Sequence, residues 1–184
     1  MGRSHAMELH YELTGQDFAD FNLHYFDNSS AVQRSILIAR ISTAAIVIIG
    51  GTILMTLLGF LSLIPLAGYL AVAALFFFGI PFYMRRRVAK NALRIVREAE
   101  NKHLCGQKAF ILHENEFELK GEGEHTSSPY NTVQRILSDE NHYYIFIGEK
   151  SGVIVPFSAF KDKDQRTDFY GRMTAHMHTP EAVQ

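Results

Sequence analysis

Residues 41–84 read ISTAAIVIIGGTILMTLLGFLSLIPLAGYLAVAALFFFGIPFYM, a run of 44 residues without Asp, Glu, Lys, Arg or His. A membrane-spanning helix needs about 20 apolar residues, so this run is long enough for two spans. Residues 41–64 are 24 uncharged positions, of which 13 are Ile, Leu, Val or Phe, and residues 66–84 add 19 more. Because proline favours a turn between helices, Pro65 predicts an antiparallel hairpin with spans at about 41–61 and 66–84.

A buried hairpin inside a soluble helical bundle is the alternative. A helix on the surface of a soluble protein carries a polar stripe, and neither run has one. We therefore favour the membrane hairpin, with the lipid bilayer as its first partner. Small residues cluster at Gly50-Gly51 and at Ala67, Ala71 and Ala74, where they allow helix backbones to approach closely. We expect the two helices of one hairpin to pack through these faces, and a homo-oligomer contact is the alternative.

The charges of the chain are segregated around the apolar run. Residues 31–102 hold nine Lys or Arg against two acids, whereas residues 103–184 hold eight against twelve. Positive charge next to the spans predicts that both ends of the hairpin, and therefore both termini, face the cytoplasm. A nucleic-acid-binding protein would place its positive charge on the folded domain, so no nucleic-acid partner is expected. A kink is expected at Pro81, near the end of the second span.

Five basic residues follow the second span and are predicted to contact anionic lipid at the membrane surface. They are Arg85, Arg86, Arg87, Lys90 and Arg94. Each basic residue near an anionic leaflet contributes about 1 kcal/mol to binding. The alternative is that these charges only fix the topology. The segment from residue 85 to 102 is expected to be a helix with an apolar stripe at Val88, Ala92, Ile95, Val96 and Ala99.

From Leu104 onward, short segments with period-two alternation predict antiparallel strands, and a final helix predicts a closed α+β domain. The expected strands are 108–113, 116–120, 130–138, 142–147 and 152–157, with a polar stretch before Pro129 and a turn at 148–152. Asp162 or Asp164 would cap the closing helix. Ahead of the hairpin, Leu9, Tyr11 and Leu13 alternate as in an extended segment, and an amphipathic helix capped by Thr14 or Asp17 follows.

These patterns divide the chain into four segments. An N-terminal cytoplasmic segment is predicted at 1–35, in which residues 1–6, ahead of Met7, resemble an added leader or follow from an early start codon. The transmembrane hairpin is predicted at 36–84, the basic amphipathic helix at 85–103 and the cytoplasmic β-domain at 104–184.

Several motifs of the chain resemble one family of bacterial membrane proteins. They are Tyr130-Asn-Thr-Val-Gln-Arg-Ile136, the aromatic strand His142-Tyr-Tyr-Ile-Phe-Ile147, the segment Val153-Ile-Val-Pro-Phe-Ser-Ala-Phe160, and the start Glu8-Leu-His-Tyr-Glu-Leu-Thr14. In this order around the hairpin, the motifs are similar to those of the YcxB-like family.

The resemblance implies an N-terminal segment, two membrane spans and a small pleckstrin-homology-like domain. It also implies a bacterial inner (plasma) membrane as the location. Two positions depart from the family pattern: Tyr130 stands where Trp is common, and Phe157 replaces a usual basic residue. The loss of that charge weakens a phosphate contact at this strand end. The family implies no activity and no catalytic residues.

The sequence offers little that predicts catalysis. Cys105 is the only cysteine, and the nine histidines lack the spacings of a zinc site. Phosphate loops and nucleophile motifs are absent, and the spans carry no ionisable residue of the kind that lines a transport path. We therefore expect no enzyme, no cofactor and no metal.

The predicted function is a membrane-anchored, non-catalytic binding or scaffold module. It would present its pleckstrin-homology-like domain at the cytoplasmic face of the membrane to an unidentified protein, peptide or lipid headgroup. The alternative is a structural subunit of a larger membrane assembly.

Overall fold

The structure, a computed structural model, describes residues 7–59, 63–148, 151–175 and 177. The chain forms two compact units: Met1–Asn22 with Asn91–Gln184, called the β-unit, and Leu23–Lys90, called the hairpin unit. The leader predicted at residues 1–6 lies outside the described residues. Helices and antiparallel sheets are both present, which confirms the α+β class.

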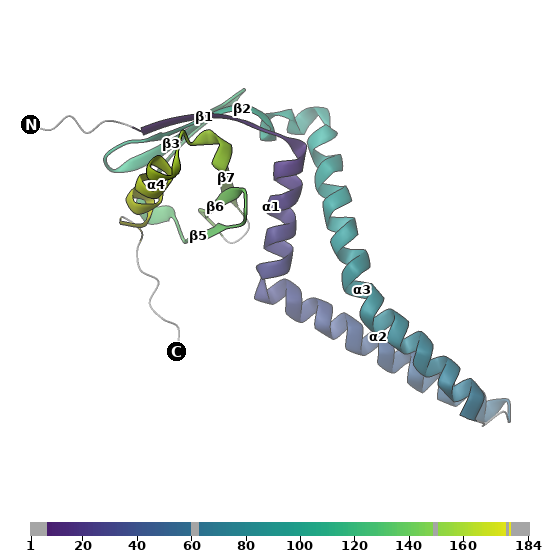
Figure 1. Ribbon diagram of the computed structural model, residues 1–184. Coiled ribbons are helices and arrows are strands. Elements are labelled where there is room, and N and C mark those ends of the chain that lie inside the picture. The colour runs from purple at the N-terminus through teal and green to yellow at the C-terminus, as the bar shows by residue number, and fades with distance from the viewer. Residues whose placement is uncertain (1–6, 60–62, 149–150, 176, 178–184) are drawn as a thin grey trace, which may run out of the picture. The chain divides into compact units, whose positions relative to one another are not determined.

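Two long helices form the hairpin, α2 at Ser30–Leu57 and α3 at Leu63–Arg97, and they lie side by side in Figure 1. Beyond the end of α2, Gly59 takes a φ of 72°, which glycine adopts without strain. The turn predicted at Pro65 is wrong, because Pro65 lies in the first turn of α3. A proline is well tolerated there, since the N–H that it lacks would have no partner within the helix.

The helices of the hairpin pack closely at Gly51. A Cβ atom on Gly51 would lie 2.5 Å from Cδ1 of Tyr69, so only glycine lets this ring lie against the backbone of α2. On α3 the residue one turn beyond Tyr69, Ala73, is buried. The alanines predicted to face α2 are instead exposed: Ala67, Ala71 and Ala74. That prediction is wrong because α3 turns the side of Tyr69 and Ala73 toward α2.

Arg40 of α2 reaches a backbone carbonyl of α3. In a regular helix the carbonyl of Phe77 would accept from the N–H four residues later, and that residue is Pro81, which has none. The Arg40 Nε donates to this carbonyl at 2.7 Å. The guanidinium carbon also lies 4.0 Å from the centre of the Phe77 ring. The side chain thus satisfies an acceptor that proline leaves without its usual donor. The helix continues through Pro81, and the predicted kink stays a prediction.

The surface of the hairpin is apolar over most of its length. By length and composition both helices can cross a membrane. Only 11% of the most apolar 18-residue stretch of α2, and 6% of that of α3, is buried. Large exposed side chains include Ile46, Leu57, Leu75 and Phe78. Large exposed apolar surfaces of this kind mark sites of contact with a membrane or with another protein.

The first sheet of the β-unit has the order β1-β2-β3-β4, with antiparallel neighbours. Its strands are β1 Met7–Leu13, β2 Gly106–Leu112, β3 Glu116–Gly121 and β4 Glu124–Pro129. β1 precedes the hairpin in the chain and β2 follows it, yet the two pair along the whole 7 residues of each. Leu9, Tyr11 and Leu13 are buried, as their alternation predicts.

The second sheet has the order β5-β6-β7, and a helix follows it. These elements are β5 Arg135–Ser138, β6 His142–Phe146, β7 Gly152–Pro156 and α4 Lys163–Ala175. Phe169 of α4 is fully buried, with its ring centre 5.5 Å from that of Phe110 on β2, so the helix closes the core as predicted. Asp162 caps α4 by accepting from the N–H of Gln165 at 2.7 Å.

Two strand predictions need correction. The polar stretch before Pro129 is strand β4, which pairs with β3 through its backbone without apolar alternation. The strand predicted at 130–138 begins only at Arg135, because Tyr130–Thr132 is a 3-10 turn, η2. Tyr130 is buried there and donates its hydroxyl to the carbonyl of His113 at 2.8 Å. The turn predicted at 148–152 includes residues 149–150, which lie outside the described residues.

Two helical segments flank the hairpin. Helix α1, Gly15–Asn28, begins with a capping box in which the N–H of Thr14 donates to Asp17 at 2.7 Å and the Thr14 hydroxyl accepts from the N–H of Asp17 at 3.3 Å. At the other end, the stripe predicted on α3 is half-buried or buried as far as Val96. Ala99 is exposed and begins the 3-10 turn η1, Ala99–Leu104.

Candidate functional site

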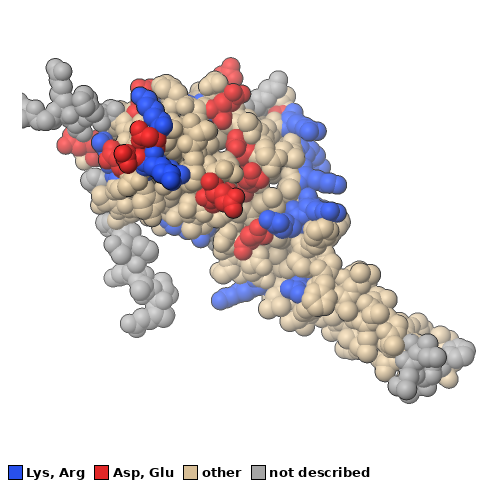
Figure 2. Space-filling model, in the orientation of Figure 1, with Lys and Arg blue, Asp and Glu red and all other residues tan. Residues whose placement is uncertain are grey.

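The basic residues predicted to meet lipid all lie on α3, and their side chains are exposed. Figure 2 shows Lys and Arg gathered along α3, with further blue patches at the near end of the hairpin, beyond which the surface is tan up to the grey tip. At about 100° per residue, Arg86, Arg87, Lys90 and Arg94 fall within about 100° of arc. We call these four residues the basic face. Arg97, in the last turn of α3, continues it.

Arg85 lies apart from the basic face. The helical spacing places it on the side of the apolar stripe, and its guanidinium pairs with Asp27 of α1 at 3.1 Å. A second donor, Nε, lies 3.2 Å from the same carboxylate oxygen. The charge of Arg85 is therefore balanced by a neighbour within the hairpin unit. The prediction placed all five residues in one group, and the structure brings four of them together.

The four side chains of the basic face are exposed and keep their charged groups at the surface of the helix. Arg86 lies over the ring of Phe82, one turn earlier, with 4.1 Å between the guanidinium carbon and the ring centre. This stacking holds the guanidinium next to the last apolar turn of the helix. Within the described residues, Arg87, Lys90 and Arg94 form no ion pair. Their donors can therefore bind phosphate oxygens without breaking an existing contact.

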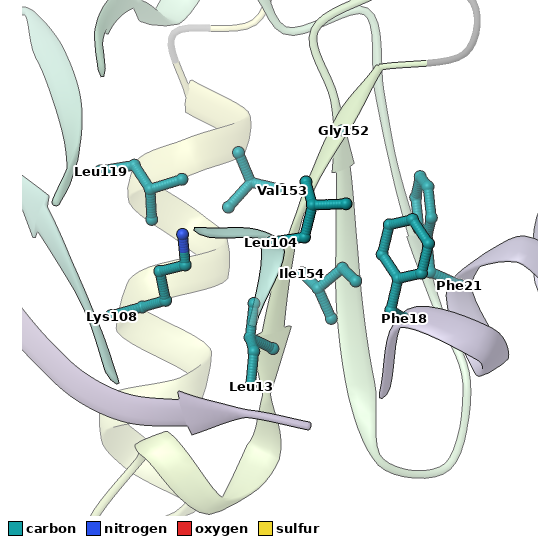
Figure 3. A pocket seen from close by; sticks show the side chains of 9 residues that line it. All are labelled: Leu13, Phe18, Phe21, Leu104, Lys108, Leu119, Gly152, Val153 and Ile154. Atoms are coloured by element: carbon teal, nitrogen blue, oxygen red, sulfur yellow. The ribbon is translucent and has the colours of Figure 1, made fainter. Parts of the chain in front are cut away.

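A small cavity lies inside the β-unit, between α1, β7 and the buried side chain of Lys108 (Figure 3). Its volume is about 80 Å³, with Phe18 and Phe21 on one side. Lys108 donates through Nζ to the carbonyl of His103 at 2.7 Å. Pockets for small organic ligands measure roughly 300–1,000 Å³, so this cavity is a gap in the packing and not a ligand site.

One comparison with known proteins gave a match, and the matched residues run from the end of β2 into α4. Residues 112–170 match the YcxB-like protein family. The resemblance drawn from the sequence is confirmed for this segment. Comparisons with curated proteins and with solved structures gave no match.

The YcxB-like segment, residues 112–170, contains three of the four motifs that pointed to the family, whereas Glu8-Leu-His-Tyr-Glu-Leu-Thr14 lies outside it. Pro156 ends β7, and residues Phe157–Ala159 form the 3-10 turn η3 that leads to α4. Phe160 then packs against Phe169 of α4, with 5.2 Å between ring centres. The ring of Phe157 lies under the guanidinium of Arg166, with 4.4 Å between the guanidinium carbon and the ring centre. These contacts give the residues of the motif roles in the packing between β7 and α4.

The histidines of the YcxB-like segment include a surface cluster on the first sheet. His113, His125 and Lys120 all contact the carboxylate of Glu118, and the last two lie on β4 and β3. Hydrogen bonds from His125 first, then from Lys120 and His113, lower the pKa of Glu118 to about 2. Among the described residues, no three His, Cys, Asp or Glu side chains are placed to hold a metal ion. The expected absence of a metal stays a prediction.

Proposed function

We propose that this protein is a membrane-anchored, non-catalytic binding module. Its hairpin would span a bacterial inner membrane, and its β-unit, with a pleckstrin-homology-like fold, would meet a protein, a peptide or lipid headgroups at the cytoplasmic face. The exposed apolar surface of α2 and α3 carries this proposal. A core helix of a soluble protein is mostly buried, whereas 11% and 6% of these helices' apolar windows is buried.

The pairing of β1 with β2 supports a topology with both termini on one side. β1 ends before the hairpin and β2 begins after it, and they share 7 residue pairs. Strands on opposite sides of a bilayer could not pair, so a membrane-spanning segment between β1 and β2 would cross an even number of times. The positive charge of the basic face supports a cytoplasmic location for that side, by the positive-inside rule.

The arrangement of the β-unit supports the pleckstrin-homology-like fold that the resemblance implies. Antiparallel strands form two sheets, and the helix α4 closes their core at the end of the chain. A sheet of this kind can bind a peptide at an edge strand, because an edge offers backbone donors and acceptors. β4 and β5 are such edges within the described residues.

The topology can be tested with the single native cysteine. In intact cells, a membrane-impermeant maleimide should leave Cys105 of the wild-type protein unlabelled until the membrane is permeabilised. Leu58→Cys in a Cys105→Ser background should be labelled in intact cells, because Leu58 follows the last residue of α2, at the end that a spanning hairpin would present on the outer side. Labelling of both positions from the same side would contradict a spanning hairpin.

The basic face should select anionic lipid. We expect protein released from nanodiscs of mixed phosphatidylglycerol and phosphatidylcholine to retain the anionic lipid, as measured by native mass spectrometry. Changing Arg86, Arg87, Lys90 and Arg94 together to Gln should reduce this preference by roughly tenfold or more, since each charge contributes about 1 kcal/mol.

Arg85 supplies the matched control for this experiment. Arg85→Gln removes one charge that is already paired with Asp27, whereas Arg87→Gln removes one that is not. Arg87→Gln should reduce retention of phosphatidylglycerol several-fold, and Arg85→Gln should leave it unchanged. Equal effects of the two substitutions would show that the basic face is not a lipid contact.

The exposed small residues of α3 favour a second function, a structural subunit of a larger membrane assembly. Ala71, Ala74 and Gly79 line a shallow apolar groove together with Leu75, Phe78 and Phe82. Because the side chains of Ala71 and Ala74 are exposed, another helix could approach α3 closely there. Cross-linking in native membranes that yields only monomer would rule this function out.

A further inference from the structure

The guanidinium group of Arg40 lies within the apolar surface of the hairpin unit. Its Nε donates to the carbonyl of Phe77 at 2.7 Å, and the uncharged run of α3 continues beyond Phe77 as far as Met84. At about 1.5 Å per residue, that carbonyl is roughly 10 Å inward from the end of the run. On α2, Leu37 and Ile38 precede Arg40 and are exposed. Arg40 therefore places a charge among apolar side chains of both helices.

The length of α3 sets the depth of this charge in a bilayer. The uncharged part of α3, from Leu63 to Met84, is about 33 Å long, and the hydrocarbon core of a bilayer is about 30 Å thick. When α3 spans that core, Met84 lies near its cytoplasmic boundary and the Phe77 carbonyl lies inside it. Arginines near the ends of membrane helices usually extend toward the interface. The bond to Phe77 instead holds the guanidinium of Arg40 at this depth.

The hairpin supplies no negative charge for Arg40. Residues 28–97 contain neither Asp nor Glu, and Asp27, the last acid before them, pairs with Arg85 at 3.1 Å. The ring of Phe77 lies against the guanidinium, with 4.0 Å between the guanidinium carbon and the ring centre, but the side chain of Arg40 is only half-buried. Within the described residues, its terminal nitrogens Nη1 and Nη2 have no hydrogen-bond or ion-pair partner. A charge at this depth needs a partner, and two donor groups are available for it.

Phosphate is the anion that a phospholipid bilayer offers at its edge. Every phospholipid carries one, whatever the net charge of its headgroup, and a guanidinium binds phosphate oxygens through paired N–H donors. A carboxylate on a helix of another protein is the other candidate. Such a helix could approach α3 closely at the groove of Ala71 and Ala74. At about 100° per residue, that groove lies opposite Tyr69 and Ala73, which face α2, so a helix seated there would not reach Arg40.

We propose, on the basis of the membrane anchoring proposed above, that Arg40 binds the phosphate group of a phospholipid. The acyl chains of this lipid lie against exposed apolar side chains of α2 that flank Arg40, Leu37 and Ile41. Its headgroup is drawn inward to the level of the guanidinium, so the bilayer is thinner at this side of the hairpin. Because the contact is to phosphate and not to net charge, Arg40 binds zwitterionic phospholipids as well as anionic ones, in contrast to the basic face.

Lipid retention by the full chain tests this contact. Protein would be released from nanodiscs of phosphatidylcholine, which is zwitterionic, mixed with digalactosyldiacylglycerol, whose neutral headgroup has no phosphate. Native mass spectrometry then gives the ratio of the two lipids that stay bound. Arg40→Gln should lower the ratio of phosphatidylcholine to the glycolipid by roughly tenfold, because a hydrogen bond to a charged group contributes about 1.5–3 kcal/mol. The basic face is present in every protein compared, so its contribution to the ratio cancels.

Two further comparisons separate phosphate binding from other roles of Arg40. Arg34→Gln removes the same charge from an exposed position nearer the start of α2, and it should change the ratio by less than about twofold. Pro81→Ala restores the N–H that the Phe77 carbonyl lacks, so in this background the hairpin no longer needs Arg40 as a donor. The preference for phosphatidylcholine should persist in Pro81→Ala and fall roughly tenfold when Arg40→Gln is added.

Equal ratios for the wild type and Arg40→Gln would overturn the proposal, as would equal effects of Arg34→Gln and Arg40→Gln. So would an effect of Arg40→Gln that disappears in the Pro81→Ala background, because Arg40 would then only stabilise the hairpin. A photo-cross-linking residue at position 37 that captures a protein in native membranes, and does so only while Arg40 is present, would assign the counter-charge to a partner and also overturn it. Failure of the membrane anchoring itself would appear separately, in the maleimide labelling described above.

Discussion

Leu9→Asp should unfold the β-unit, although Leu9 precedes the hairpin in the sequence and all the other strands of the β-unit follow it. Leu9 is 1% exposed on β1, opposite Phe110 of β2. Burial of a leucine side chain contributes about 1.5–3 kcal/mol, and a buried carboxylate without a partner costs several kcal/mol more. The sum is a large fraction of the roughly 5–15 kcal/mol that stabilises a domain. Thermal unfolding in detergent micelles, followed by limited proteolysis of the β-unit, measures the loss.

His10→Asp is the matched control, because His10 is exposed and points to the other face of the same strand. It introduces the same carboxylate one residue away and should change the melting temperature by only a few degrees. A small domain loses about 4–8 °C for each kcal/mol. If Leu9→Asp melts within about 5 °C of the wild type, then β1 is not an integral strand of the sheet.

This dependence on β1 illustrates which parts of the fold local sequence can predict. The uncharged run at 41–84 and the alternation of Leu9, Tyr11 and Leu13 each carry their own signal, and the structure agrees with both. The partner of β1 carries no such signal, because the whole hairpin separates it from β2. Strand β4, with the sequence EHTSSP, has no apolar alternation either, since pairing of its backbone with β3 makes it a strand.

The candidate site likewise combines features that local sequence predicts with contacts between residues far apart in the sequence. The basic face follows from the composition of α3, and helical spacing separates Arg85 from its neighbours once the direction of the apolar stripe is known. The pairing of Arg85 with Asp27 is visible only in three dimensions, as is the hydrogen bond from Arg40 to the carbonyl of Phe77. One signal was available in the sequence: a proline within a helix frees the carbonyl four residues earlier, here that of Phe77.

Arg40→Met should destabilise the hairpin by about 2–3 kcal/mol, because it removes the Nε donor of the Phe77 carbonyl, which Pro81 leaves without its usual N–H. Pro81→Ala should be neutral or stabilising, since alanine supplies the missing N–H. In the Pro81→Ala background, Arg40→Met should cost much less. Reversible unfolding of the four proteins in mixed micelles, followed by circular dichroism, gives the coupling energy between the two positions.

Arg34→Met separates this contact from a simple role of charge in topology. Arg34 lies six residues earlier on α2, is exposed, and carries the same charge. If Arg40 only oriented the hairpin, then Arg34→Met and Arg40→Met would have equal effects, and Pro81→Ala would change neither. A cost that is specific to Arg40 and depends on Pro81 would instead mean that the two residues act as one unit. The charge at the end of the first span would then be fixed to the second span by a hydrogen bond.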